Sequence, residues 1–100
     1  MSCSAVTNAV LVWIPDGDGF LKMTFTWSGS NMLFFRVFYD MDDGGGFLTV
    51  LTRRIHGQGR HSELENYPFV SGQIWRARLI TVCVGCEESP DVISNTVVIP

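Results

Sequence analysis

Charged residues are scarce in this chain. They make up 17% of its 100 residues, whereas roughly 25% is usual for a globular protein. Basic residues are the rarer kind, with seven Lys and Arg against ten Asp and Glu, so the net charge is −3. Because nucleic-acid binding normally needs a basic excess, we expect no nucleic-acid partner. Hydrophobic residues form 46% of the chain, and so much apolar side chain with so little charge excludes intrinsic disorder.

The sequence also has no long apolar run and no N-terminal segment with the pattern of a signal peptide. No apolar segment approaches the ~18 residues of a membrane-spanning helix, so we expect no membrane partner. The first residues carry no basic segment, so the sequence predicts no signal peptide. A length of 100 residues suits one compact domain, and we expect a single domain over residues 1–100.

Cysteine is present in a small, odd number: Cys3, Cys83 and Cys86. A small secreted domain that is stabilised by disulfides usually has an even number of cysteines, four or more. The sequence therefore favours reduced thiols in a protein made in the cytoplasm. Cys83 and Cys86 have the spacing of a redox or zinc motif, but no helix follows them and no second ligand pair matches them. We expect these two residues to pack in a turn, with a local disulfide between them as the alternative.

Strand signals recur at short intervals, and no helical pattern lies between them. Residues 21–27 alternate strictly between apolar and polar, which is the period of a strand with one buried face. The expected strands cover residues 9–14, 21–27, 32–39, 47–52, 63–66, 74–83 and 94–99. About seven strands at this spacing are typical of a sandwich. The predicted fold class is therefore all-β, a two-sheet antiparallel β-sandwich.

The strand pattern resembles the fibronectin type III family of immunoglobulin-like sandwiches. That family ends its second strand with Trp, as Met23-Thr-Phe-Thr-Trp27 does, and has a Tyr-x-Val-x-Tyr third strand similar to Phe35-Arg-Val-Phe-Tyr39. Phe69-Val-Ser-Gly-Gln-Ile-Trp75 keeps the spacing of the segment that opens the sixth strand. Trp75 replaces the family's corner tyrosine, so the usual hydroxyl hydrogen bond is lost or replaced. The Arg-Gly-Asp integrin-binding tripeptide is absent, so the resemblance implies the fold and not that activity.

Two acidic loops are similar to parts of cation sites. Asp16-Gly-Asp-Gly19 is similar to the start of a calcium loop, but Trp27 stands at the twelfth position, where such a loop needs Glu. Asp40, Asp42 and Asp43 lie beside three glycines and form the second loop. We expect both segments to be solvated hairpins, and we predict no metal site.

Catalysis has no support in the sequence. His56 and His61 would need a nucleophile or a carboxylate partner in a pocket to act as general bases, and the glycine-flanked loop that joins them holds nothing rigidly. No P-loop, nucleophile elbow or metalloprotease motif is present. We therefore expect a protein that is not an enzyme and has no cofactor.

Alternation along the third and sixth strands predicts two faces of one sheet. In the type III alignment the inward residues are Leu33, Phe35, Val37, Tyr39, Trp75, Ala77 and Leu79. The outward residues are then Phe34, Arg36, Phe38, Arg76, Arg78 and Ile80. Because Phe and Arg are enriched at interfaces, we predict that this outer face binds a protein partner or a second copy of the chain. The alternative is that Arg stems cover the Phe rings without any partner, and the apolar run at 9–14 is a second candidate surface.

Two roles fit a small binding or structural module of this kind. The first is a virion component, such as a bacteriophage capsid decoration or cement protein that docks on a major capsid protein and is assembled in the host cytoplasm. The second is a spacer, or an adhesion or carbohydrate-binding module, of a bacterial extracellular protein. The expected reduced thiols, the absence of a signal peptide and the partly apolar outer face favour the first role. We predict that role, with the extracellular module as the alternative.

Overall fold

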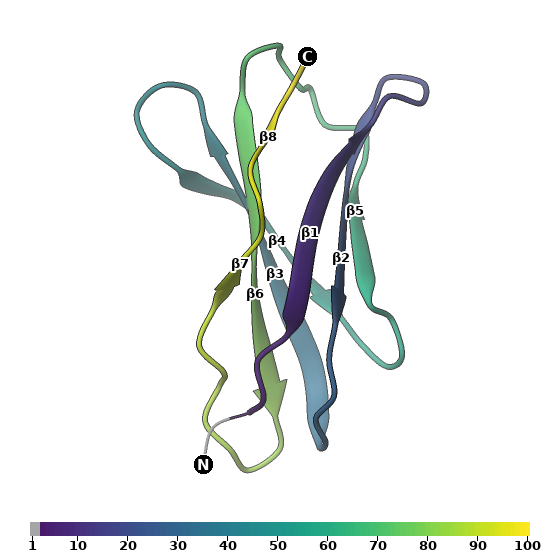
Figure 1. Cartoon of the computed structure of the whole chain (residues 1–100), viewed down its shortest axis with the longest axis vertical. Coiled ribbons are helices and arrows are strands. Elements are labelled where there is room, and N and C mark those ends of the chain that lie inside the picture. The colour runs from purple at the N-terminus through teal and green to yellow at the C-terminus, as the bar shows by residue number, and fades with distance from the viewer. Residues whose placement is uncertain (1–2) are drawn as a thin grey trace.

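The computed structural model describes residues 3–100, which form two antiparallel sheets packed face to face (Figure 1). One sheet has three strands in the order β1-β2-β5, and the other has the order β4-β3-β6-β7, with β8 also paired to β6. The strands are β1 (Thr7–Ile14), β2 (Phe20–Thr26), β3 (Met32–Asp42), β4 (Leu48–Ile55), β5 (His61–Leu64), β6 (Ile74–Cys83), β7 (Val92–Ile93) and β8 (Val97–Val98). Among these residues there is no helix long and apolar enough to cross a membrane. The predicted all-β, two-sheet antiparallel sandwich is confirmed.

Of the last predicted strand, at 94–99, only Val97–Val98 is a strand, and another short strand, β7, precedes it across a polar interruption. Ser94 lies between β7 and β8, and its Oγ accepts a hydrogen bond of 2.8 Å from the backbone N–H of Ala77. The Ser94 side chain thus binds the Ala77 N–H, which would otherwise donate to a backbone carbonyl of a continuous strand. The strand is interrupted there, so eight strands form where about seven were expected.

The core lies between the sheets and is filled by every second residue of β3 and β6. The residues with no exposed surface on these two strands are Phe35, Val37, Tyr39, Trp75, Ala77, Leu79 and Thr81. Leu21, Met23 and Phe25 face them from β2. The inward positions predicted by alternation on the two strands are therefore correct, with one exception.

The exception is Leu33, whose side chain is 50% exposed. Met32 pairs with Cys83 and Phe34 with Val82, so a bulge in the β3–β6 register lies between the two pairs. A bulge places one extra residue on its strand and redirects the side chain of that residue. Leu33 therefore points to solvent, and its predicted inward position is wrong.

Trp75 retains a polar contact in place of the corner tyrosine of type III domains. Its indole Nε1–H donates to Oε1 of Gln73 over 3.3 Å. The hydroxyl hydrogen bond of the family is thus replaced by an indole hydrogen bond to a side chain two residues away. The ring also packs edge-on against Tyr67, with 5.2 Å between ring centroids.

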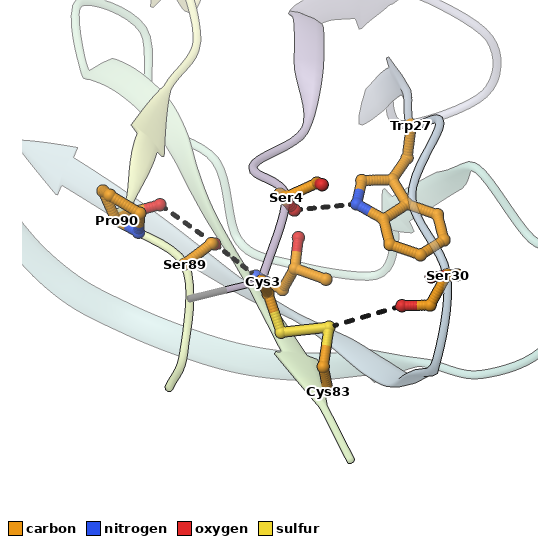
Figure 2. Close-up of a disulfide and its surroundings, with 8 residues drawn as sticks. Cys3, Ser4, Trp27, Ser30, Cys83, Ser89 and Pro90 are labelled. Carbon is orange, nitrogen blue, oxygen red and sulfur yellow. Dashed lines mark hydrogen bonds between the residues drawn. A yellow bond between two sulfur atoms is a disulfide. The ribbon is translucent and has the colours of Figure 1, made fainter. Parts of the chain in front are cut away.

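The cysteine prediction is wrong. A disulfide joins Cys3 to Cys83 across 80 residues of sequence, with a Cα–Cα distance of 5.9 Å (Figure 2). Cys86 is an exposed free cysteine. The segment before β1 runs past the end of β6, where the N–H of Cys3 donates to the carbonyl of Glu87 over 2.9 Å. Spacing along the chain gives no indication of this contact, because only the folded sheets bring the two segments together.

Candidate functional site

The six residues of the predicted binding surface lie together on the outer side of the five-stranded sheet. Arg36 pairs with Ile80 and Phe38 with Arg78 across the β3–β6 ladder. On the other side of β3, Arg54 of β4 pairs with Arg36. All six are half-buried: Phe34, Arg36, Phe38, Arg76, Arg78 and Ile80. We call this surface, with Asp40, Thr52 and Arg54 added, the outer face.

Asp40 is the buried centre of the outer face. It is 1% exposed, and its Oδ2 accepts hydrogen bonds from Nε of Arg76 over 3.0 Å and from Nε of Arg78 over 2.6 Å. Its Oδ1 accepts from Nη2 of Arg78 over 3.3 Å and from the Thr49 hydroxyl over 2.9 Å. One carboxylate therefore holds two guanidinium groups and a hydroxyl in place.

Sequence reasoning placed Asp40 in a solvated acidic loop, and that expectation is wrong. β3 extends to Asp42, so Asp40 continues the outward alternation that begins at Phe34. Asp42 is the last residue of β3 and Asp43 lies in the turn that follows, where Oδ1 of Asp42 accepts the backbone N–H of Gly44 over 2.8 Å. The alternation of outward positions would have identified Asp40, had the strand been continued past Tyr39.

The electrostatics of this cluster keep it ionised. Burial by itself would raise the pKa of Asp40, but hydrogen bonds from Arg78, Arg76 and Thr49 outweigh burial and hold the pKa below its ordinary value. The hydrogen bond to Asp40 in turn raises the pKa of Arg78. The Asp40 carboxylate and the Arg78 guanidinium therefore stay charged at neutral pH.

Arg side chains lie over the aromatic rings of the outer face and its border. Four guanidinium–ring pairs have distances to the ring centroid within the usual cation–π range of about 6 Å. They are Arg54 over Phe34 at 4.4 Å, Arg36 over the same ring at 5.7 Å, Arg78 over Phe38 at 4.6 Å and Arg76 over Phe47 at 4.2 Å. The covering of rings by Arg, which was the alternative to an interface, is therefore present in the geometry, and it leaves the rings half-buried.

Charge is least neutralised at the Phe34 end of the outer face. Nη1 of Arg36 lies 3.5 Å from Oε1 of Glu88, but the Glu88 side chain is half exposed, and such pairs contribute only about 0–1 kcal/mol. Within residues 3–100, no acidic side chain lies within ion-pair distance of Arg54. This end therefore presents a ring together with cationic groups that have little internal compensation.

The second candidate surface is the outer side of β1. Val10 and Val12 are 42% and 44% exposed and lie opposite Thr24 and Lys22 of β2. No strand of the described chain covers this side of the three-stranded sheet. It is apolar and uncovered, but it lacks the aromatic and Arg residues of the outer face.

The two histidines flank a shallow cleft of about 410 Å³ between β4 and β5, which Arg53 and Glu63 also line. The buried Ser62 hydroxyl accepts a hydrogen bond of 2.8 Å from Tyr39, so it is not presented to a substrate in the cleft. The His56 ring lies against Phe34, with 5.6 Å between centroids. Over the described part of the chain, no group of three or more His, Cys, Asp or Glu is placed to hold a metal ion.

Comparison with known proteins identifies the fold. No protein-family model matches the chain, and no curated protein matches its sequence. Solved structures do match, and one of them, described as a myokine structure, superposes with a TM-score of 0.62 over 94% of this chain and 92% of its own. The two sequences are 12% identical, so the likeness concerns the fold alone. Together with the strand order, it shows that the chain has a fibronectin type III-like β-sandwich fold.

Proposed function

We propose that the chain is a non-enzymatic interaction module that docks onto a partner protein through the outer face. The observation that carries this proposal is the Asp40 cluster, which fixes Arg76 and Arg78 among aromatic rings on a sheet surface with no covering layer. The fibronectin type III-like fold is compatible with such a role.

The cluster lowers the entropic part of the free energy of docking. Ordering a long side chain at an interface costs about 0.5–1.5 kcal/mol, and Arg76 and Arg78 are ordered before any partner arrives. Full burial of a Phe side chain contributes about 1.5–3 kcal/mol, so the part that remains exposed on each of Phe34 and Phe38, which are only partly buried, corresponds to about 1 kcal/mol at most. These small gains in binding free energy add up on a rigid surface, because little entropy is lost in ordering its side chains.

The charges of the outer face define the partner. Arg54 has no carboxylate partner in the described chain, and Arg36 has only the exposed Glu88. A complementary surface would place apolar side chains over Phe34 and Phe38 and carboxylates opposite Arg36 and Arg54, since Arg binds carboxylates through paired hydrogen bonds. The partner we propose is therefore a protein with an acidic and apolar surface, and a second copy of this chain is the competing occupant.

The absence of enzymatic activity belongs to the same proposal. Two of the side chains that could take part in catalysis have other contacts: His56 lies against Phe34, and the Ser62 hydroxyl is bonded to Tyr39. These contacts support a structural role for both residues, because a catalytic group must reach a substrate within hydrogen-bond distance.

Two settings remain for the module. A virion component of the capsid decoration or cement type, docked on a major capsid protein, is the setting expected from the sequence, and the outer face would be its docking surface. An extracellular spacer or adhesion module is supported by the same face and also by the Cys3–Cys83 disulfide, since disulfides persist in oxidising compartments and are rare in the cytoplasm. The disulfide favours the extracellular setting over assembly in the cytoplasm, and we adopt it in the proposal.

Photo-cross-linking in the native setting tests the outer face. A photoreactive residue in place of Thr52, which pairs with Phe38, should capture one defined partner, and the adduct should disappear when Phe34 and Phe38 are both changed to Asp. The matched control carries Asp at Val10 and Val12 on the other sheet and should leave the adduct intact. Thermal unfolding checks that both double variants are folded.

Persistence of the Thr52 adduct in the folded Phe34→Asp, Phe38→Asp variant would show that the outer face is not the docking surface. Loss of the adduct only in the β1 variant would assign docking to the outer side of β1. An adduct with twice the mass of the chain would identify the occupant as a second copy, which light scattering on a size-exclusion column would check independently.

A further inference from the structure

Three cysteines share one cleft at the end of the sandwich where β6 finishes. Cys3, Cys83 and Cys86 all line this cleft, which has a volume of about 520 Å³. Cys3 and Cys83 are bonded to each other and are 6% and 7% exposed, whereas Cys86 is exposed and carries a free thiol (Figure 2 shows the bonded pair). A free thiol therefore lies beside a disulfide.

Cys83 is within reach of either of the other two cysteines. Its Cα lies 5.9 Å from that of Cys3. Val84 and Gly85 form a turn between Cys83 and Cys86, with Gly85 at a φ of 71°. A β-turn brings the Cα atoms of its first and fourth residues within about 7 Å, and disulfides span Cα distances of about 4.4–6.8 Å. A bond between Cys83 and Cys86 therefore requires only a local adjustment of the turn.

We propose that Cys86 exchanges with the Cys3–Cys83 disulfide. The thiolate of Cys86 attacks Sγ of Cys83, the Cys83–Cys86 bond forms, and Cys3 leaves as a thiolate that takes up a proton. One disulfide breaks and one forms, so the step needs no external oxidant or reductant. Thiolates are the attacking species in such exchange, and Cys86 carries the exposed free thiol beside the disulfide.

Exchange changes how the N-terminal segment is held. With the disulfide broken, the contacts that remain there include the bond from Cys3 N–H to the Glu87 carbonyl, at 2.9 Å, and the bond from Trp27 Nε1 to the Ser4 carbonyl, at 2.7 Å. The covalent link across 80 residues is replaced by one inside a turn, so the segment before β1 is then held by noncovalent contacts alone. The Cys3 thiol then becomes available for coupling to another disulfide, which makes the site a modification site as well.

Tryptic peptide mapping distinguishes the two disulfide states. Cleavage after Lys22 and Arg78 leaves Cys3 on an N-terminal peptide and places Cys83 and Cys86 together on peptide 79–100. The Cys3–Cys83 bond links the two peptides, whereas exchange separates them. The native protein would be held at several pH values, alkylated with N-ethylmaleimide in acid, digested without reductant and analysed by mass spectrometry.

We expect separated peptides to appear, with the alkyl label moving from Cys86 to Cys3. The rate should rise about tenfold or more between pH 6.5 and 8.5, because exchange requires a thiolate. It should not depend on protein concentration, which distinguishes an internal step from exchange between molecules.

The Cys86→Ser variant lacks the attacking thiol and should stay fully linked, with an unchanged unfolding midpoint because residue 86 is exposed. The proposal is overturned if the wild-type protein stays linked at pH 8.5 with its label on Cys86, or if the Cys86→Ser variant separates at the same rate.

Discussion

The substitution Asp40→Asn removes the negative charge at the centre of the outer face and preserves the shape of the side chain. Three N–H groups of Arg76 and Arg78 donate to this carboxylate, at 3.0, 2.6 and 3.3 Å. Hydrogen bonds to a charged group contribute about 1.5–3 kcal/mol each and neutral ones about 0.5–1.5 kcal/mol, so loss of the charge removes about 1 kcal/mol from each bond that is kept. The Asn NH2 group cannot accept, so the bonds to the oxygen that it replaces are lost. The two Arg side chains are 27% and 23% exposed, and water offsets part of the loss. We therefore expect the free energy of unfolding to fall by about 2 kcal/mol.

Denaturant unfolding followed by tryptophan fluorescence measures this loss. The matched control is Asp43→Asn, because Asp43 is exposed and forms no ion pair within the described residues. Surface substitutions of that kind usually change stability by no more than about 0.5 kcal/mol. If Asp40→Asn costs no more than Asp43→Asn, the carboxylate does not hold the outer face together.

The pH dependence separates charge from packing. The pKa of Asp40 is lowered in the folded state, so its contribution to stability is fully present above the pKa of an unfolded Asp, about 3.9, and is lost as the pH falls through the lower folded pKa. The stability difference between wild type and Asp40→Asn should be constant from about pH 5 to 7 and should shrink in stronger acid. A difference that persists in strong acid would indicate that packing, not charge, causes the loss.

Two further predictions concern polar contacts elsewhere in the molecule. Tyr39→Phe removes the hydroxyl that donates to Ser62 over 2.8 Å and should lower the free energy of unfolding by about 1–2 kcal/mol. The control Tyr67→Phe, measured in the same denaturant assay, should lower the free energy of unfolding by less. Asn95→Ala removes the side chain that bonds both backbone groups of Leu11, each over 2.8 Å, and should lower stability by about 1–3 kcal/mol. Amide hydrogen exchange at Leu11 should accelerate in that variant, and an unchanged rate would contradict the contact.

Local periodicity is what made the fold and the composition of the outer face predictable. Residues that alternate along β3 and β6 must point to opposite sides of a sheet, so burial of Phe35 and Val37 implies that Phe34 and Arg36 share the other side. Leu33 departs from this rule because a bulge inserts a residue, and a bulge depends on how the partner strand is registered. Alternation by itself carries no information about that register.

The features that the sequence left hidden are contacts between segments far apart in the chain. Cys3 and Cys83 are 80 residues apart, and Asp40 meets Arg76 and Arg78 only because β3 and β6 are neighbours in one sheet. A segment of acidic residues and glycines has the composition of a loop, and this composition predicts a solvated position for Asp40. The register of β3 against β6 places it opposite Arg76 and makes its burial favourable, since a buried charge needs paired partners.

The edges of the two sheets are a further place where a partner protein could bind. A free edge strand is the usual site of strand addition, and these edges are protected within the described chain. Asn95 occupies the backbone groups of Leu11 on β1, and β5, β7 and β8 are only two to four residues long. The other long edge, β4, has eight residues like β1, carries Arg53 and Arg54 and pairs with β3 across a bulge, and both features disfavour strand addition. Association through a sheet face is therefore favoured over association through an edge, and the face whose charges Asp40 holds in place is the one we propose.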